Sequence, residues 1–465
     1  MKEKIKTYAK EHLQEMLQDI KKVVAVRSIK GDPLLGKPFG EGPAAAVSCM
    51  EEIAKRHGFR PNNFDNYMLT VNLNDLPDEL GILCHLDVVH EGTGWTTPPY
   101  EMDIRDGKIY GRGTADNKGP AVAALYALKC VRDLGIPLKK NVRLMLGTNE
   151  ESGMKDLPEY FKREAPPPFS ISPDAAFPIY NIEKGRFGPT FAAEFKKDDT
   201  LPRILSIDSG HAANIVPGEA CAVVCGLTAE EILPYIKACE ESTGAAFECE
   251  DKDSKLLVKA KGLSAHAAYP GDGNNAATAI IALLTSMPMF SGEGFERLKG
   301  VNRLLPHGGW DGKNIGIKME DKLSGILTCN LGIFKYSETG IVGRIDIRSP
   351  ICSNEGNCSL VMEKSFNNEG FKLDTTKMVL PHYVPEELPF IQTLKSVFEE
   401  CTGLPCDCVS MGGGTYVHGI PNSVAFGAAF PDTETYAHSA DEYAVIDELE
   451  ACVSIFANVI VEMCK

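Results

Sequence analysis

The sequence predicts an α/β protein of two domains, in which one domain is interrupted by the other. A chain of 465 residues is too long for one simple hydrophobic core. Strand and helix patterns alternate over residues 1–186 and again over 378–465, as in a layered domain with a mainly parallel sheet flanked by helices. Between them, over 187–377, closely spaced strands alternate apolar and polar side chains, which predicts an inserted α+β domain.

Apolar spacing and helix-end residues define the elements of the first segment. Apolar residues from Ile5 to Val24 recur at helical spacing, so the chain begins with an amphipathic helix. Pro120 and Gly135 occupy the first turn and the end of a long helix, where these residues are favoured. The elements that follow the first helix are predicted as helix 44–58, strands 67–73 and 80–89, helix 117–135, strand 141–151, helix 153–164 and strand 169–177.

The insert is predicted to contain two weakly similar halves, each a strand, a helix and a strand. Its strands show period-two alternation, and its two helices have apolar residues at helical spacing. After the insert, the helix and strand alternation of the first segment returns. The expected elements are strands 188–195, 202–207 and 220–227, helix 228–244, strands 246–250 and 340–347, helix 354–370, strand 371–374, helix 387–403, strand 423–430 and helix 441–463.

Composition excludes several classes of function. The 64 acidic residues outnumber 48 basic ones and give a formal net charge of −16, which argues against a nucleic-acid-binding surface. No apolar run approaches the roughly 18 residues of a membrane span, and the N-terminus lacks the apolar core of a signal peptide. We therefore expect a cytoplasmic protein whose 15 cysteines are reduced and mostly small core residues.

A histidine and several carboxylates gather where the predicted strands of the first segment end. His85 and Asp87 are two residues apart on one strand, so their side chains face the same way. Asp116 stands directly before a helix, and the next strand ends carry further acids, namely Glu150, Glu151 and Asp174. In an open α/β sheet the carboxyl ends of the strands meet at one crevice, where ligands bind.

Each of these residues has an ordinary explanation when it is taken alone. Asp116 could be a helix N-cap, Asp174 a turn residue, and the paired glutamates a solvated face. Their order at successive strand ends instead predicts a site for divalent cations, which would neutralise so many carboxylates. Mixed histidine and carboxylate ligands suit Zn, Mn or Co, and a closed, cysteine-rich structural zinc site is excluded.

Five separated motifs carry a resemblance to a known family, namely "HLDVV", "GRGTADNKGP", "GTNEESG", "SPDAAFP" and "YAHSADEY". In this order they resemble the co-catalytic metallopeptidase family of aminoacylases, glutamate carboxypeptidases and dipeptidases, and most closely its PepV-type dipeptidases. The resemblance covers nearly the whole chain, the insert included. It implies a phosphorylase/hydrolase-like catalytic domain interrupted by a two-lobed lid domain.

The resemblance also implies a role for each motif residue. Two divalent metal ions per chain, zinc in the first place, would be held by His85, Asp116, Glu151, Asp174 and His438, with Asp116 bridging both. Asp87 would hydrogen-bond the His85 imidazole and fix its tautomer. Glu150 would be the general base for a water that the two metals activate. The family also tends to have a cis peptide after the bridging aspartate, here between Asp116 and Asn117.

Residues of the insert and of a glycine run would bind the substrate. His266 resembles the family's lid histidine, which donates to the transition-state oxyanion, and Asn214 matches a position in the same lid. Arg348 would clamp the C-terminal carboxylate of a peptide, with Arg344 as the rival. Gly413 and Gly414, in the run that begins at Gly412, would offer backbone amides to an anion, although such a run alone could equally be a flexible turn.

These expectations together predict a metal-dependent dipeptidase. A lid with an arginine clamp limits substrate length to dipeptides or short tripeptides, and broad specificity, with β-alanyl and Xaa-His dipeptides included, is implied. The long insert would supply its histidine within the same chain, which favours a monomer. An N-acyl-amino-acid deacylase of the acetyl-amino-acid or succinyl-diaminopimelate type would use the same metals. A binding protein that has lost catalysis is disfavoured, because every motif residue is present.

Overall fold

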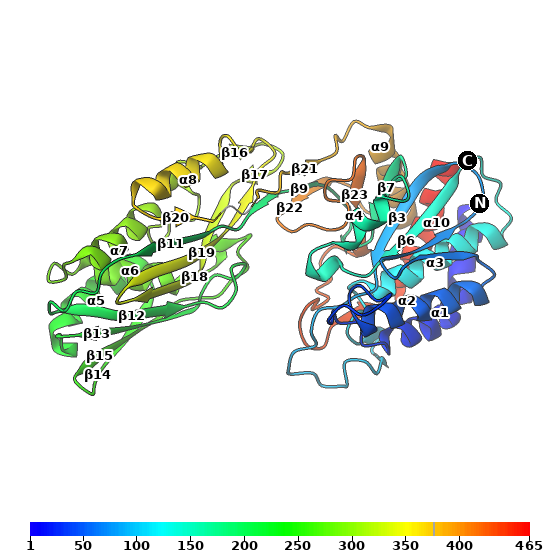
Figure 1. Ribbon diagram of the computed structural model, residues 1–465. Coiled ribbons are helices and arrows are strands. Elements are labelled where there is room, and N and C mark those ends of the chain that lie inside the picture. Colours follow the sequence, from blue (N-terminus) through cyan, green and yellow to red (C-terminus); the bar gives the residue numbers. More distant parts are fainter. Residues whose placement is uncertain (375–376) are drawn as a thin grey trace. The chain divides into compact units, whose positions relative to one another are not determined.

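The computed structural model describes residues 1–374 and 377–465, and the chain divides into two compact units. The first unit comprises residues 1–182, 383–410 and 414–465, and the second comprises 183–382 and 411–413. Each unit has its own sheet and its own hydrophobic core (Figure 1). The second unit therefore lies within the sequence of the first.

The sheet of the first unit is mixed, with four parallel strands at its centre. In the order β6–β3–β7–β23, each neighbouring pair is parallel, whereas β1, β2 and β9 join antiparallel at the outside. The strands of this sheet are β1 (Pro61–Phe64), β2 (Met68–Asn72), β3 (Asp78–His85), β6 (Asn141–Gly147), β7 (Phe169–Ser172), β9 (Ile179–Glu183), β21 (His382–Tyr383), β22 (Cys408–Met411) and β23 (Ser423–Ala425). Shorter sheets are formed by β4 (Asp103–Arg105), β5 (Lys108–Tyr110) and β25 (Tyr443–Val445), and by β8 (Ala175–Ala176) and β24 (Ala428–Ala429).

Helices cover both faces of this sheet. On β6, Leu144 and Leu146 belong to the large core, whereas Met145 belongs to a smaller cluster, because successive side chains on a strand point to opposite faces. The large core also contains side chains from α1 (Lys2–Val24), α2 (Glu41–Arg56), α3 (Lys118–Asp133), α9 (Pro389–Thr402) and α10 (Ile446–Cys464). The smaller cluster is covered by Leu157 and Tyr160 of α4 (Asp156–Phe161). The layered α/β arrangement predicted from the sequence is confirmed.

The second unit contains one antiparallel sheet that runs through both predicted halves. Its strands alternate buried and exposed residues, as in β13 and β15, which is typical of a sheet with one covered face. The strands are β10 (Gly185–Phe187), β11 (Thr190–Glu194), β12 (Arg203–Ser209), β13 (Glu219–Cys225), β14 (Ala246–Lys252), β15 (Lys255–Lys261), β18 (Thr328–Ser337), β19 (Gly340–Ser349) and β20 (Lys372–Leu373), and a separate hairpin joins β16 (Glu320–Asp321) and β17 (Gly325–Ile326).

Four helices pack against this sheet, and two of them were not predicted. They are α5 (Ala229–Thr243), α6 (Ala276–Ser286), α7 (Glu293–Leu304) and α8 (Ser359–Asn368). Eight of the eleven residues of α6 are buried, so this helix lacks the polar stripe by which helical periodicity is recognised. None of the helices in the described part of the chain is long and apolar enough to cross a membrane.

Candidate metal centre

The candidate centre lies at the carboxyl ends of three neighbouring parallel strands of the first unit. β3 ends at His85, β6 is followed by a 3-10 helix (Glu150–Ser152) that begins with Glu150 and Glu151, and Asp174 follows β7. Because parallel strands end at the same edge of a sheet, these side chains converge on one place. Asp116 joins them from the turn that leads into α3.

Five side chains form two groups that share Asp116. In the first group, His85 Nε2 lies 2.8 Å from Asp116 Oδ1 and 3.3 Å from Asp174 Oδ1. In the second group, His438 Nε2 lies 3.0 Å from Asp116 Oδ2 and 3.0 Å from Glu151 Oε1. The two oxygens of Asp116 thus face two different imidazoles, an arrangement that suits a carboxylate shared by two cations.

The donor set fits two divalent cations. Within each group one ligand atom per residue lies within 4.8 Å of the others, and each group offers one imidazole and two carboxylates. Zn, Mn and Co accept this mixture of ligands, and both groups lack cysteine. The structure therefore brings together all five residues predicted as metal ligands.

Within the two groups, the imidazoles and carboxylates shift one another's pKa values. Hydrogen bonds with Asp116 and Glu151 raise the pKa of the His438 imidazole to about 11, although this side chain remains half exposed. Burial alone would raise the pKa of Asp116, but its hydrogen bonds with His438 and His85 outweigh burial and hold that pKa well below its usual range. Burial raises the pKa of Asp174 to about 6. A cation at either group would favour the charged carboxylates and the neutral imidazoles instead.

Asp87 contacts His85 through its backbone and the two glutamates through its side chain. The imidazole Nδ1 of His85 lies 2.9 Å from the backbone carbonyl oxygen of Asp87 but 3.6 Å from its carboxylate. The carboxylate accepts hydrogen bonds from the backbone N–H groups of Glu150 and Glu151, at 3.1 and 3.2 Å. Asp87 therefore bonds the His85 imidazole through its backbone carbonyl, whereas its carboxylate bonds the backbone of the two glutamates.

The two adjacent glutamates are placed differently. Glu151 belongs to the second metal group, whereas Glu150 belongs to neither group within the described residues. Burial and the nearby charge of Asp174 raise the pKa of the Glu150 carboxyl well above its usual range. A carboxyl group with a raised pKa beside a metal centre has the properties of a proton acceptor that works near neutral pH.

A buried ion pair that the sequence analysis missed supports the Asp116 turn. Glu442 Oε1 accepts hydrogen bonds from the N–H groups of Gly113, Ala115 and Asp116, at 3.0 to 3.1 Å. Its Oε2 lies 2.7 Å from Nη1 of Arg112, and both side chains are almost fully buried. The sequence contains one signal for this residue, because Glu442 stands four residues after His438 in the motif "YAHSADEY". It contains no sign that Glu442 bonds the turn that holds Asp116.

The backbone is unusual at two of the ligands. The peptide bond between Asp116 and Asn117 is cis, as the family resemblance implied. His438 has a φ of 64°, in the left-handed region that non-glycine residues rarely adopt. Non-glycine residues in the left-handed region cluster at functional sites, where the surrounding structure holds them in place.

Two predicted substrate residues form a separate arrangement in the second unit. Asn214 and His266 are both exposed, and their segments pair as an antiparallel bridge. The N–H of Ala267 donates to the carbonyl of Asn214 at 2.9 Å, and the N–H of Val216 donates to the carbonyl of Ala265 at 2.8 Å. These bonds hold the two exposed side chains on one surface of the second unit.

Arg348 has more hydrogen-bond partners within the protein than its predicted role implied. Its Nε and Nη2 donate to the two carboxylate oxygens of Asp346, at 2.6 and 2.9 Å, and its Nη1 donates to the carbonyl of Gly412 at 2.7 Å. Arg348 is 8% exposed, whereas the rival Arg344 is exposed on the same strand. Gly413 belongs to the second unit with Arg348, and Gly414 belongs to the first.

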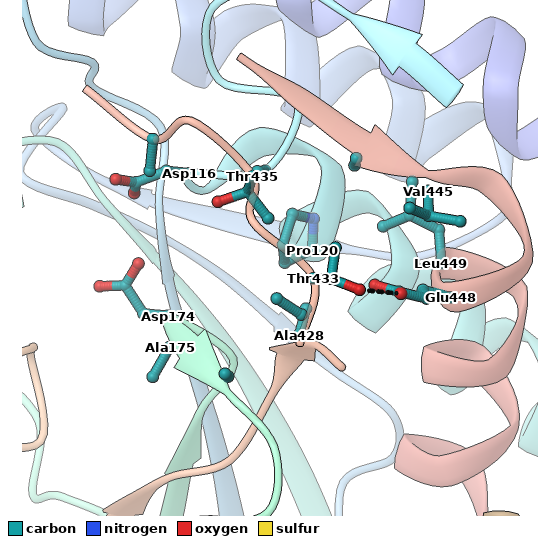
Figure 2. A pocket seen from close by; sticks show the side chains of 15 residues that line it. Asp116, Pro120, Asp174, Ala175, Ala428, Thr433, Thr435, Val445, Glu448 and Leu449 are labelled. Atoms are coloured by element: carbon teal, nitrogen blue, oxygen red, sulfur yellow. Dashed lines mark hydrogen bonds between the residues drawn. The ribbon is translucent and has the colours of Figure 1, made fainter. Parts of the chain in front are cut away.

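A cavity of about 210 Å³ lies beside the metal ligands in the first unit. Asp116 and Asp174 form part of its wall, and most other lining residues are alanines. Figure 2 shows the carboxylates of Asp116 and Asp174 on one side of this space, with Thr433, Val445 and Glu448 on the other.

Comparison with known proteins decides the family. Residues 81–462 match the model of peptidase family M20/M25/M40. The chain belongs to this family. The M20 chain is 36% identical over 459 residues to the "Putative dipeptidase YtjP" of Bacillus subtilis (strain 168), which covers 97% of this chain and 98% of that protein. It is 34% identical to the β-Ala-Xaa dipeptidase of Lactobacillus delbrueckii subsp. lactis, covering 97% and 96% of the two chains.

Solved structures confirm the fold of the M20 chain. Human carnosine dipeptidase 1 matches with a TM-score of 0.61 at 17% identity, covering 99% of this chain and 98% of that chain. The aminoacylhistidine dipeptidase of Vibrio alginolyticus matches with a TM-score of 0.59 at 12% identity, covering 97% and 96%. The resemblance drawn from the five sequence motifs is thus confirmed at the level of the family and the fold, and the M20 chain is a hydrolase of the peptidase class.

Proposed function

We propose that this M20 peptidase is a metal-dependent dipeptidase that hydrolyses unblocked dipeptides and short tripeptides. The single observation that carries the proposal is the pair of ligand groups that share Asp116, with Glu150 beside them and outside both groups. Such a pair suits two divalent cations, with zinc first and Mn or Co as alternatives. The substrate class is supported by the dipeptidase names of the relatives.

The residues of the first unit would divide the work of the reaction. When bound, the two metal ions supply an activated water and polarise the scissile carbonyl. Glu150 would accept the proton of that water and pass it to the departing amine, because it is adjacent to the ligand Glu151 and belongs to neither ligand group within the described residues. Glu151 is held by its contact with His438 and serves as a ligand. The carboxylate of Asp87, bonded to both backbone N–H groups, would keep the two glutamates in these orientations.

The second unit would act as a lid that binds the rest of the substrate. In this proposal His266 donates a hydrogen bond to the oxyanion of the transition state, and Asn214 supports it from the paired segment. Arg348 would bind the C-terminal carboxylate through the N–H groups that Asp346 and Gly412 leave free. Gly413 and Gly414 would contribute backbone amides. Because the lid lies within the same chain, we propose that the enzyme acts as a monomer.

The substrate range proposed for this chain follows the names of a relative and of a structural neighbour. One relative is named for β-Ala-Xaa dipeptides, and one structural neighbour for aminoacylhistidine dipeptides. We propose broad specificity for dipeptides, with β-alanyl and Xaa-His dipeptides included. We also propose a cytoplasmic location, because all 15 cysteines are free thiols.

A panel of substrates tests the proposed reaction. The metal-supplemented enzyme is assayed with free dipeptides, tripeptides, N-acetyl-amino acids and N-succinyl-diaminopimelate at equal concentration. The proposal predicts that free dipeptides are cleaved much faster than every N-acylated compound. Faster cleavage of the N-acylated amino acids would instead identify a deacylase, and no cleavage of any dipeptide would refute the proposal.

A further inference from the structure

A cavity in the first unit lies beside the metal ligands. It has a volume of about 210 Å³, and all of its lining residues belong to the first unit. Asp116 and Asp174 form part of its wall, so the cavity is continuous with the candidate metal centre. Figure 2 shows the remaining lining residues, which come from the loop at 433–437, the turn before α3, the starts of α3 and α10, and the strands β8, β24 and β25.

Alanine is the most frequent residue of the wall. Seven of the fifteen lining residues are alanines, and further apolar surface comes from Pro120, Val445 and Leu449. Alanine side chains end at Cβ, so this wall leaves open the volume that larger side chains would fill. An apolar cavity of about 150 Å³ is large enough to admit benzene, and this cavity is therefore large enough for a leucine or phenylalanine side chain.

All charged residues of the wall are acidic. Among the described residues, the charged ones that line the cavity are Asp116, Asp174 and Glu448. The carboxylate of Glu448 is fixed by the Thr433 hydroxyl at 2.6 Å and by the N–H of Phe430 at 3.2 Å. An acidic ligand group would be desolvated here beside the carboxylate of Glu448, whereas an apolar group would meet the methyl groups of the wall.

We propose that this cavity binds the side chain of the N-terminal residue of the substrate, and that it selects apolar side chains over acidic ones. The inference rests on the proposed dipeptidase function. In a dipeptide the scissile carbonyl belongs to the N-terminal residue, so the proposed reaction places this residue beside the metal ligands of the first unit. Ala429 and Thr435, on different elements of the wall, then limit the size of the N-terminal side chain.

Filling the cavity tests this assignment. The substitution Ala429→Leu adds side-chain volume to the wall at a position that is not itself a metal ligand. The wild type and the variant are compared on Leu-Gly, Gly-Leu, Gly-Gly and Asp-Gly. Gly-Leu carries the same side chain on the other residue, so it controls for composition. A matched substitution, Ala238→Leu on the exposed side of α5, controls for the added leucine.

The inference predicts changes that depend on the substrate. Wild type should prefer Leu-Gly to Asp-Gly, and Ala429→Leu should lower kcat/KM for Leu-Gly about 10-fold or more while Gly-Gly and Gly-Leu change less than about 2-fold. Thr435→Leu, on the loop at 433–437, should give the same substrate-dependent changes in kcat/KM. It replaces Ala429→Leu in the experiment if that variant does not fold. Equal losses on all substrates in a folded variant, or a loss confined to Gly-Leu, would overturn the inference. A wild type that cleaves no dipeptide would instead overturn the proposed function.

Discussion

Asp116 is the residue on which both candidate metal groups depend. Each of its carboxylate oxygens faces a different imidazole, and its backbone N–H is held by the buried Glu442. Groups that orient a ligand in this way are worth 10- to 100-fold in metal affinity or activity in known metal sites. The carboxylate of Asp87 serves the neighbouring Glu150 and Glu151 in the same manner, through their backbone N–H groups.

The paired glutamates give a prediction at this scale. Glu150→Gln should lower kcat about 100-fold or more, because the amide cannot accept a proton, while metal content stays near that of the wild type. Glu151→Gln, the matched change one residue away, should lose metal, because it removes a ligand from the second group. Elemental analysis of both variants beside kcat measurements checks this. Equal metal loss in the two variants would show that the division of labour is wrong.

At the scale of elements, the side chain of Asn330 joins the two exposed segments of the second unit. This buried residue of β18 donates to the carbonyls of Ala213 and Ile215, at 3.1 and 2.9 Å, on both sides of Asn214. Its Oδ1 accepts from the side chain of Asn275, the N-cap of α6, at 3.1 Å. Since the Asn214 segment pairs with the His266 segment, Asn330 fixes the position of both.

The substitution Asn330→Asp is nearly isosteric but removes both donated hydrogen bonds and turns a carboxylate toward two carbonyls. We expect kcat to fall about 10-fold or more, because small displacements of catalytic groups are costly, while metal content is unchanged. The loss should be largely absent in a His266→Ala background, which a double-mutant cycle measures. Asn367→Asp, at an exposed position of α8, is the control. Fully additive effects of Asn330→Asp and His266→Ala would contradict a positioning role.

The sequence sufficed for features that depend on local pattern and failed where distant segments meet. Strand ends marked by His85 and Asp174 could be placed on one edge because parallel strands share a direction. Glu442 was missed because its partners lie more than 300 residues away. The helix α6 was missed because it is buried nearly all round. For Asp87, residue spacing could not tell whether the side chain or the backbone carbonyl contacts His85.

At the scale of the whole molecule, a buried charge joins the three N-terminal helices of the first unit. Asp19 of α1 is fully buried and accepts hydrogen bonds from Arg56 of α2 and, at 2.9 Å, from Tyr126 of α3; His57, just after α2, also lies 2.9 Å from it. Burial alone would raise the pKa of Asp19, but these hydrogen bonds outweigh burial and lower it. The ionised carboxylate therefore stabilises the helical layer behind the sheet.

Removing this carboxylate should destabilise the fold in a pH-dependent way. Asp19→Ala should lower the free energy of unfolding at pH 7 by about 3 kcal/mol, the cost of breaking a buried ion pair. Because the folded pKa lies below the unfolded value, the contribution is complete above a pH of about 4 and is lost as the pH falls further. Urea unfolding from pH 7 down to pH 3 should show that the difference in free energy of unfolding between the variant and the wild type becomes smaller. Glu11→Gln, at an exposed position of α1, should have little effect, and a difference independent of pH would contradict the account.

The central claim is that five ligands sharing Asp116 hold two metal ions that are needed for dipeptide hydrolysis. The most direct measurement strips the enzyme with a chelator and then follows Leu-Gly hydrolysis as zinc or manganese is titrated back, with bound metal counted per chain. We expect activity to disappear on stripping and to return as two ions per chain are bound. The claim would be contradicted if the stripped, metal-free enzyme kept its activity, or if activity returned fully with no metal bound to the chain.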